Sequence, residues 1–232
     1  MLMFLEFMMK SIVIVGAGIG GCTTYLFLKK YLSPDVSIHI YESYPPPPYL
    51  SNLQNKSTTP NSDEKPGVGK GSIPNVTSAN AFLFLCLSPN GIRVIKSLDH
   101  DIYERIKAVG VEVEGFGAQL ASGRMLGEFK AGGKRHGHGT LLLARAAMHD
   151  AVLERVNADD ISFNMKVKRV LDKESKVKIE FESGECIDAD MVIGADGVWS
   201  KTREAIPECA KYKPEYEYVP SQLNFDLKLV YS

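Results

Sequence analysis

Short apolar runs alternate with helical patterns in the first part of the chain. The run from Ser11 to Val15, SIVIV, is uninterrupted and β-branched, which is typical of a strand buried on both faces of a parallel sheet. A glycine-rich turn follows, then a helical pattern from Gly20 to Tyr31 and a second strand from Val36 to Tyr41. This order and these lengths predict a parallel strand–helix–strand crossover.

Further along, the pattern predicts both strands and helices. A turn at Ser88-Pro89-Asn90-Gly91 is expected from its residue types. The expected elements are a strand at 81–87, helices at 92–98 and 141–156, an antiparallel hairpin formed by 161–170 and 177–181, and a strand at 187–193. The fold class is therefore α/β, with a parallel sheet and an accessory antiparallel hairpin.

Three segments depart from this pattern and divide the chain. Residues 1–9 look like an appended leader. They are apolar, but Glu6 and Lys10 interrupt the run and no basic segment precedes it, so a signal peptide or membrane anchor is not favoured. Residues 44–77 hold seven of the twelve prolines and predict a disordered insertion. Residues 207–232 form an atypical tail, which leaves 10–206 as the nucleotide-binding domain.

Charge and cysteine usage exclude several classes of function. A net charge of -1 gives no electrostatic reason to expect nucleic acid or an anionic membrane surface as a partner. The four cysteines are scattered, without a Cys-x-x-Cys pair or a histidine at a zinc spacing. We therefore expect reduced thiols in the cytoplasm, no structural metal and no transmembrane segment. The oligomeric state does not follow from these features.

The first glycine cluster has the spacing of a dinucleotide-binding turn. Gly16, Gly18 and Gly21 satisfy G-x-G-x-x-G between a strand and a helix, where they permit a tight turn, close approach of a pyrophosphate and close helix packing. Glu42 lies 21 residues past Gly21, at the end of the second strand, where a carboxylate can accept from a ribose hydroxyl. The alternative is an ordinary glycine-rich turn. The strand, helix and Glu42 together favour FAD or NAD over NADP.

A second strand ends in glycine far downstream, in GADGVWSKTR at 194–203. With GAGIGG at the start, it resembles the Asp-Gly motif of the FAD-dependent aromatic hydroxylases, the class A flavoprotein monooxygenases. LSPNGIRVI at 87–95 is similar to that family's segment after the second strand. LLLARAAMHDAVL at 141–153 is similar to its Arg-x-x-Leu helix, with Arg145 at the arginine. The four motifs follow the family's order.

The resemblance implies a Rossmann-like FAD-binding domain in an NAD(P)H-dependent monooxygenase that hydroxylates or epoxidises a small, often aromatic, substrate. It implies that Asp196 and Gly197 help to hold the FAD pyrophosphate and ribityl region and influence binding of the nicotinamide nucleotide. Arg145 would face the flavin from an apolar helix stripe. The alternative for Asp196 is a turn-capping role, and the alternative for Arg145 is a snorkelling side chain or an internal ion pair. No catalytic residue is identified.

The chain also departs from the family's pattern. None of its twenty glycines is followed by aspartate, so the family's second, Gly-Asp motif is missing, and no pattern of a substrate sheet follows Arg203. These departures predict a C-terminally truncated member whose substrate domain is mostly missing. Two alternatives stay open: a non-catalytic nucleotide-binding remnant, and a flavin reductase or halogenase with the same FAD-binding half.

Overall fold

The computed structural model describes residues 10–48, 50, 84–120, 122–130, 137, 139–173 and 175–210. They fall into two compact units: unit 1 combines the residues up to 81 with 152–210, and unit 2 comprises 82–151. The predicted leader at 1–9, most of the insertion at 44–77 and the tail from 211 onward lie outside the described residues.

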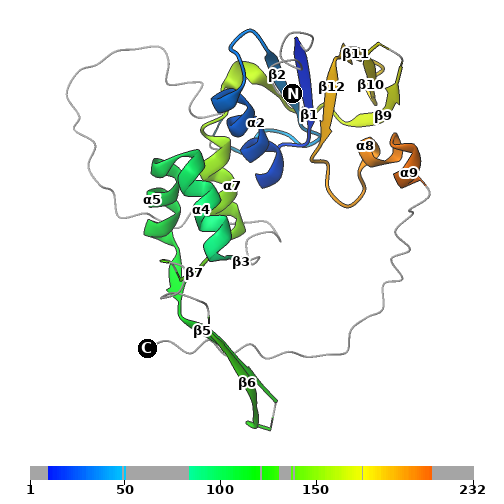
Figure 1. Cartoon of the computed structure of the whole chain (residues 1–232). Coiled ribbons are helices and arrows are strands. Elements are labelled where there is room, and N and C mark those ends of the chain that lie inside the picture. Colours follow the sequence, from blue (N-terminus) through cyan, green and yellow to red (C-terminus); the bar gives the residue numbers. More distant parts are fainter. Residues whose placement is uncertain are drawn as a thin grey trace, which may run out of the picture. The chain divides into compact units, whose positions relative to one another are not determined.

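Unit 1 is built on a parallel sheet of four strands (Figure 1). Strand β1 (Ser11–Val15) leads into helix α2 (Ile19–Tyr31), which returns to β2 (Ser37–Tyr41). The sheet order is β12-β1-β2-β8, where β12 is Met191–Gly194 and β8 is Ile161–Ser162. The predicted crossover and the parallel sheet are confirmed. Two strands distant in the sequence, β1 and β12, lie side by side and end at the same edge.

Strand β1 is buried on both faces, as its apolar run predicts. Ile12 and Ile14 share one face with Ile38 and Ile40 of β2, and all four side chains are at most 2% exposed. Helix α2 packs against these two strands. Alternate residues of β1 turn to the opposite face, where they join a core cluster around Phe181.

The accessory antiparallel sheet has three strands rather than the predicted two. Its order is β11-β10-β9, comprising Cys186–Ala189, Val177–Phe181 and Val167–Asp172. The predicted strand at 161–170 is two strands, because β8, preceded by the 3-10 turn Ala158–Asp160, joins the parallel sheet. The predicted strand at 187–193 also divides, at Asp190, between β11 and β12. Unit 1 ends with α8 (Lys201–Glu204) and α9 (Pro207–Ala210).

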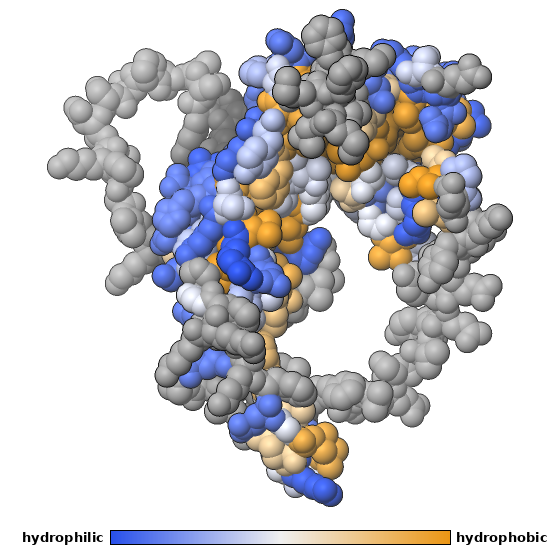
Figure 2. Space-filling model, in the orientation of Figure 1, coloured by the Kyte–Doolittle hydropathy of each residue, from blue (hydrophilic) through white to orange (hydrophobic). Residues whose placement is uncertain are grey.

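Unit 2 contains two amphipathic helices and two small antiparallel sheets. Helices α4 (Pro89–Leu98) and α5 (His100–Val109) accompany a sheet of order β3-β7-β4, comprising Phe84–Leu87, Thr140–Ala144 and Val111–Val113. A hairpin of β5 (Gly115–Gln119) and β6 (Met125–Lys130) extends from this unit. Figure 2 shows hydrophobic residues at its free end, where Met125 and Leu126 are exposed. The sequence pattern did not predict α5 or the strands from 111 to 130.

Two predicted elements of unit 2 are wrong in detail. The expected turn at 88–91 is the beginning of α4: Ser88 is its N-cap, its hydroxyl accepts from the N–H of Gly91, and Pro89 occupies the first turn. These residue types favour a helix start as strongly as a turn. The helix expected from Leu141 begins only at Arg145, as α7 (Arg145–Leu153), because 140–144 form strand β7. The boundary between the two units falls within α7.

Candidate functional site

The first glycine turn connects β1 to α2 and is held by backbone contacts. Gly16 has φ +101°, which favours glycine, and its N–H donates to the carbonyl oxygen of Tyr41 at 2.8 Å. A Cβ atom on Gly21 would lie 1.9 Å from the carbonyl oxygen of Gly16. The helix therefore approaches the turn too closely for any side chain at Gly21, which is the packing role predicted for that glycine.

Gly18 has the opposite surroundings. It is the N-cap of α2 and has extended backbone angles, φ -67° and ψ 178°, which any residue can adopt. A Cβ atom built there would meet no heavy atom within 4 Å. The first N–H groups of a helix have no acceptor within the helix and carry its positive dipole end. Gly18 thus leaves open space beside a group of donors suited to a phosphate.

Glu42 lies against the same turn. Its Oε2 atom accepts from the N–H of Ala17 at 2.6 Å, and its Oε1 atom accepts from the N–H of Tyr44 at 2.9 Å and from the hydroxyl of Ser43 at 3.0 Å. Each carboxylate oxygen can accept two hydrogen bonds, so Oε2 retains acceptor capacity beside the glycine turn.

The thiol of Cys22, in helix α2, is not a reactive group of this site. Burial and the Glu42 charge raise the pKa of the Cys22 thiol to about 12, so this thiol is protonated and unreactive.

The two glycine turns touch each other. The N–H of Ala195, just after β12, donates to the carbonyl oxygen of Val15 at 2.8 Å. A Cβ atom on Gly16 would lie 2.6 Å from the carbonyl oxygen of Ala195. Gly197 then reverses the chain with φ +75°. Both turns sit at the carboxyl ends of neighbouring parallel strands, which is where ligands bind in sheets of this kind.

Asp196 uses its carboxylate to fix the second turn. Its Oδ1 atom accepts from the hydroxyl of Ser200 at 2.6 Å, and its Oδ2 atom accepts from the N–H groups of Lys201 and Thr202 at 2.7 and 3.1 Å. The hydroxyl of Ser200 caps α8 by accepting from the N–H of Arg203. The guanidinium group of Arg203 donates to the carbonyl oxygen of Val198 at 2.6 Å. The turn-capping alternative describes the observed contacts of Asp196, and a direct role toward FAD stays a prediction.

Replacing Asp196 with alanine removes these bonds, whereas asparagine keeps one acceptor oxygen. We expect Asp196→Ala to lower the free energy of unfolding by about 1–2 kcal/mol and Asp196→Asn by clearly less, as for other capping residues. Urea unfolding of both variants measures this difference. Equal losses in the two variants would show that the charge, and not the cap, is what matters.

Asp190 positions β1 against β12, and sequence reasoning missed it. Its Oδ2 atom accepts from the N–H groups of Lys10 and Ser11 and from the Ser11 hydroxyl, at 2.8–2.9 Å. These bonds, with the Lys10 N–H as the largest cause, lower the pKa of the Asp190 carboxyl. The signal in the sequence was an aspartate directly before the apolar run at 191–193, with Asp188 two residues earlier, and a strand pattern of alternating polar positions also explains it.

The lowered pKa of Asp190 predicts a pH dependence of stability. A carboxyl whose pKa is lower in the folded state stabilises the fold above its unfolded pKa, and this contribution is lost as the pH falls through the folded pKa. We therefore expect Asp190→Asn to be less stable than the wild type at neutral pH, with the difference shrinking on acidification. Urea unfolding over a pH series tests this. A difference that is independent of pH would contradict the assignment.

The structure places Arg145 differently from the prediction. Arg145 is exposed, at the first residue of α7, so its expected position on a buried apolar stripe is wrong: Leu141, the supposed start of that stripe, belongs to strand β7. Arg145 lies in unit 2, whereas the other predicted site residues lie in unit 1. Trp199, which follows Gly197 in the second turn, is 74% exposed.

Two further kinds of site, metal centres and membrane spans, concern the described part of the chain. No group of three or more His, Cys, Asp or Glu side chains there could hold a metal ion. None of the helices within the described ranges is long and apolar enough to cross a membrane. His136 and His138, in the segment KRHGHGT, lie outside the described residues.

Known proteins resemble this chain in sequence and in fold. No protein-family profile matches the chain. It is 29% identical over 145 residues to 3-amino-4-hydroxybenzoate 2-monooxygenase from Streptomyces cremeus, covering 59% of this chain and 36% of that protein. It is 27% identical over 226 residues to kynurenine 3-monooxygenase from Debaryomyces hansenii, covering 92% of this chain and 42% of that protein.

Both of these proteins are monooxygenases, so the chain is similar in sequence to monooxygenases of the kind that its motifs resemble. The fold agrees with this relationship: the structure of HpxO from Klebsiella pneumoniae, complexed with FAD and uric acid, matches with a TM-score of 0.57 at 19% identity. That match covers 84% of this chain and 41% of HpxO. The chain thus spans about two fifths of the length of the family members that it matches.

Proposed function

We propose that this chain binds FAD through unit 1 and forms the nucleotide-binding half of an NAD(P)H-dependent flavin monooxygenase acting on a small organic, often aromatic, molecule. One observation carries the proposal: the two glycine turns meet at the carboxyl ends of β1 and β12, with open space at Gly18. Turns at the carboxyl ends of neighbouring parallel strands are the usual ligand-binding position in sheets of this kind.

The residues present fit the adenosine diphosphate part of FAD. The N-terminus of α2 and the open face of Gly18 would receive the pyrophosphate. Glu42 would accept from a ribose hydroxyl, since its Oε2 atom has acceptor capacity beside the turn. Gly197 and the capped second turn would line the continuation toward the ribityl chain, with Asp196 acting by holding that turn. When bound, FAD supplies the redox and oxygen chemistry, and the chain's own residues bind and orient it.

The remaining parts of the proposal rest on the family relationship. By analogy with the aromatic hydroxylases, the reductant would be a nicotinamide nucleotide and the substrate would be aromatic. Arg145 would contribute to the cofactor site by the same analogy. A cytoplasmic location rests on the cysteines, of which Cys22, Cys86, Cys186 and Cys209 are all free thiols. The rival functions are a nucleotide-binding chain without activity, and a flavin reductase or halogenase.

Oxidation of NADPH and NADH by the purified chain separates these functions. We expect oxidation that depends on added FAD, exceeds the rate with free FAD alone, and consumes oxygen. With a panel of phenolic acids, formation of hydroxylated product would favour the hydroxylase, whereas electron transfer to added free flavin would favour a reductase. FAD binding without oxidation above the free-flavin rate would contradict the proposed activity and support the inactive alternative.

A further inference from the structure

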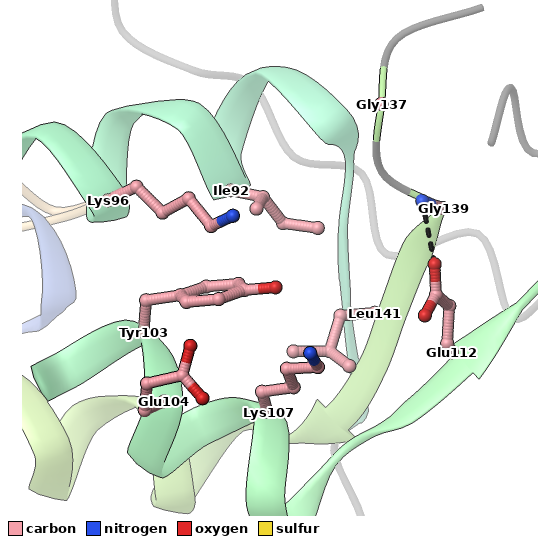
Figure 3. A pocket seen from close by; sticks show the side chains of 9 residues that line it. All are labelled: Ile92, Lys96, Tyr103, Glu104, Lys107, Glu112, Gly137, Gly139 and Leu141. Atoms are coloured by element: carbon pink, nitrogen blue, oxygen red, sulfur yellow. Dashed lines mark hydrogen bonds between the residues drawn. The ribbon is translucent and has the colours of Figure 1, made fainter. Parts of the chain in front are cut away.

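Unit 2 contains a pocket that the nucleotide site does not use. It has a volume of about 330 Å³, which is the size of a small-molecule site. It lies between α4, α5 and the sheet strands β4 and β7 (Figure 3). Ile92 and Leu141 form its apolar part, and both are 4% exposed. The other side chains that line it are Lys96, Tyr103, Glu104, Lys107 and Glu112.

The two lysines share one aromatic ring. The Nζ atom of Lys96 lies 4.1 Å from the ring centroid of Tyr103, and that of Lys107 lies 5.8 Å from it. Figure 3 shows the two ammonium groups on different sides of the ring, with the tyrosine hydroxyl pointing into the space near both. Tyr103 is only 7% exposed, so it is a fixed support. Cation–π attraction draws both ammonium groups toward the pocket rather than letting them extend freely into solvent.

The two glutamates of the pocket are held by other groups. The Oε1 atom of Glu112 accepts from the N–H of Gly139 at 2.9 Å, and Gly139 has no side chain to obstruct this approach. Glu104 pairs with His100 at 3.6 Å when that histidine is protonated. The two carboxylates offset the charge of the two lysines. The ammonium groups and the Tyr103 hydroxyl lie around a small space whose apolar side is formed by Ile92 and Leu141.

We propose that this pocket binds a small organic molecule with a single carboxylate and an apolar or aromatic body. The ammonium groups of Lys96 and Lys107 would donate to the carboxylate, and the body would lie against Ile92 and Leu141. A single negative charge suits the site better than a doubly charged phosphate, because Glu104 and Glu112 repel each added negative charge. The site belongs to unit 2 and does not depend on the proposed nucleotide site.

The test is an NMR titration of the full chain with benzoate as the probe, alongside benzamide and inorganic phosphate. We expect saturable benzoate binding, with benzamide and phosphate binding more weakly. Lys96→Gln and Lys107→Gln should each weaken benzoate binding by about fivefold or more, since each removes a charged donor from a partly exposed site. Lys107 is exposed and Lys96 is half-buried, so we expect the fold to be retained, and thermal unfolding checks this.

Lys30→Gln is the matched control, because Lys30 lies 5.8 Å from the ring centroid of Tyr31 in unit 1 but lines no part of this pocket. It should leave the benzoate affinity unchanged, and so should Gly18→Val, which alters only the nucleotide site. The proposal fails if benzoate shows no saturable binding, or if benzamide or phosphate binds as tightly as benzoate. It also fails if the pocket variants and Lys30→Gln behave alike.

Discussion

Replacing Gly21 with alanine is expected to destabilise unit 1 by about 3 kcal/mol or more, the upper range for overpacking a well-packed site. The added Cβ atom would lie 1.9 Å from the carbonyl oxygen of Gly16. That carbonyl cannot easily retreat, because the N–H of Gly16 donates to the carbonyl oxygen of Tyr41, and the space beside Gly16 is so tight that a Cβ atom there would lie 2.6 Å from the carbonyl oxygen of Ala195. Urea unfolding followed by circular dichroism measures the loss.

Gly20→Ala is the matched control, because Gly20 lies in the same helical turn and a Cβ atom there would meet nothing within 4 Å. Alanine is a better helix former than glycine by up to about 1 kcal/mol, so Gly20→Ala should be neutral or stabilising. The two substitutions are thus expected to have opposite signs. If Gly21→Ala also stabilised the chain, the close packing of the turn on the helix would be wrong.

Replacing Gly18 with valine should abolish nucleotide binding while leaving the fold intact. No heavy atom lies within 4 Å of the Cβ position and the backbone angles suit any residue, so we expect little change in the free energy of unfolding. The valine side chain would occupy the space through which the phosphates approach the helix N-terminus. We expect FAD affinity to fall by more than about 100-fold, which corresponds to ~2.7 kcal/mol of binding free energy.

The control for this experiment is Gly127→Val, at another glycine with nothing within 4 Å of its Cβ position but in strand β6 of unit 2. Calorimetric titration with FAD should give wild-type affinity for this variant. Unchanged FAD binding in Gly18→Val, at wild-type stability, would show that the nucleotide does not bind at the first glycine turn.

The parallel sheet could be predicted because its signals are local. The run at 11–15 is buried on both faces and the glycine turn follows it directly, so one short window holds the strand, the turn and the helix start. The second turn was found in the same way. The contact between the two turns depends on the register of β1 against β12. No local sequence pattern specifies that register.

The errors arose where one pattern fits two structures. LLLA at 141–144 is apolar enough for a helix face or a strand, and its pairing with β3 and β4 decides for the strand. Because 140–144 form a strand, Arg145 is the first residue of α7 rather than an interior residue of the predicted helix at 141–156. Asp190 was missed because the N–H groups that it accepts from lie about 180 residues away in the chain. Tertiary contacts, rather than propensity, fix these positions.

Competition between nucleotides for FAD binding tests the central claim most directly. In an equilibrium titration of the full chain, followed by flavin fluorescence, we predict that FAD binds at one site and that ADP displaces it. FMN, which lacks the adenosine half, should displace FAD poorly or not at all, because Gly18 and Glu42 lie at the adenosine diphosphate end. Failure of FAD to bind, or displacement by FMN but not by ADP, would contradict the account.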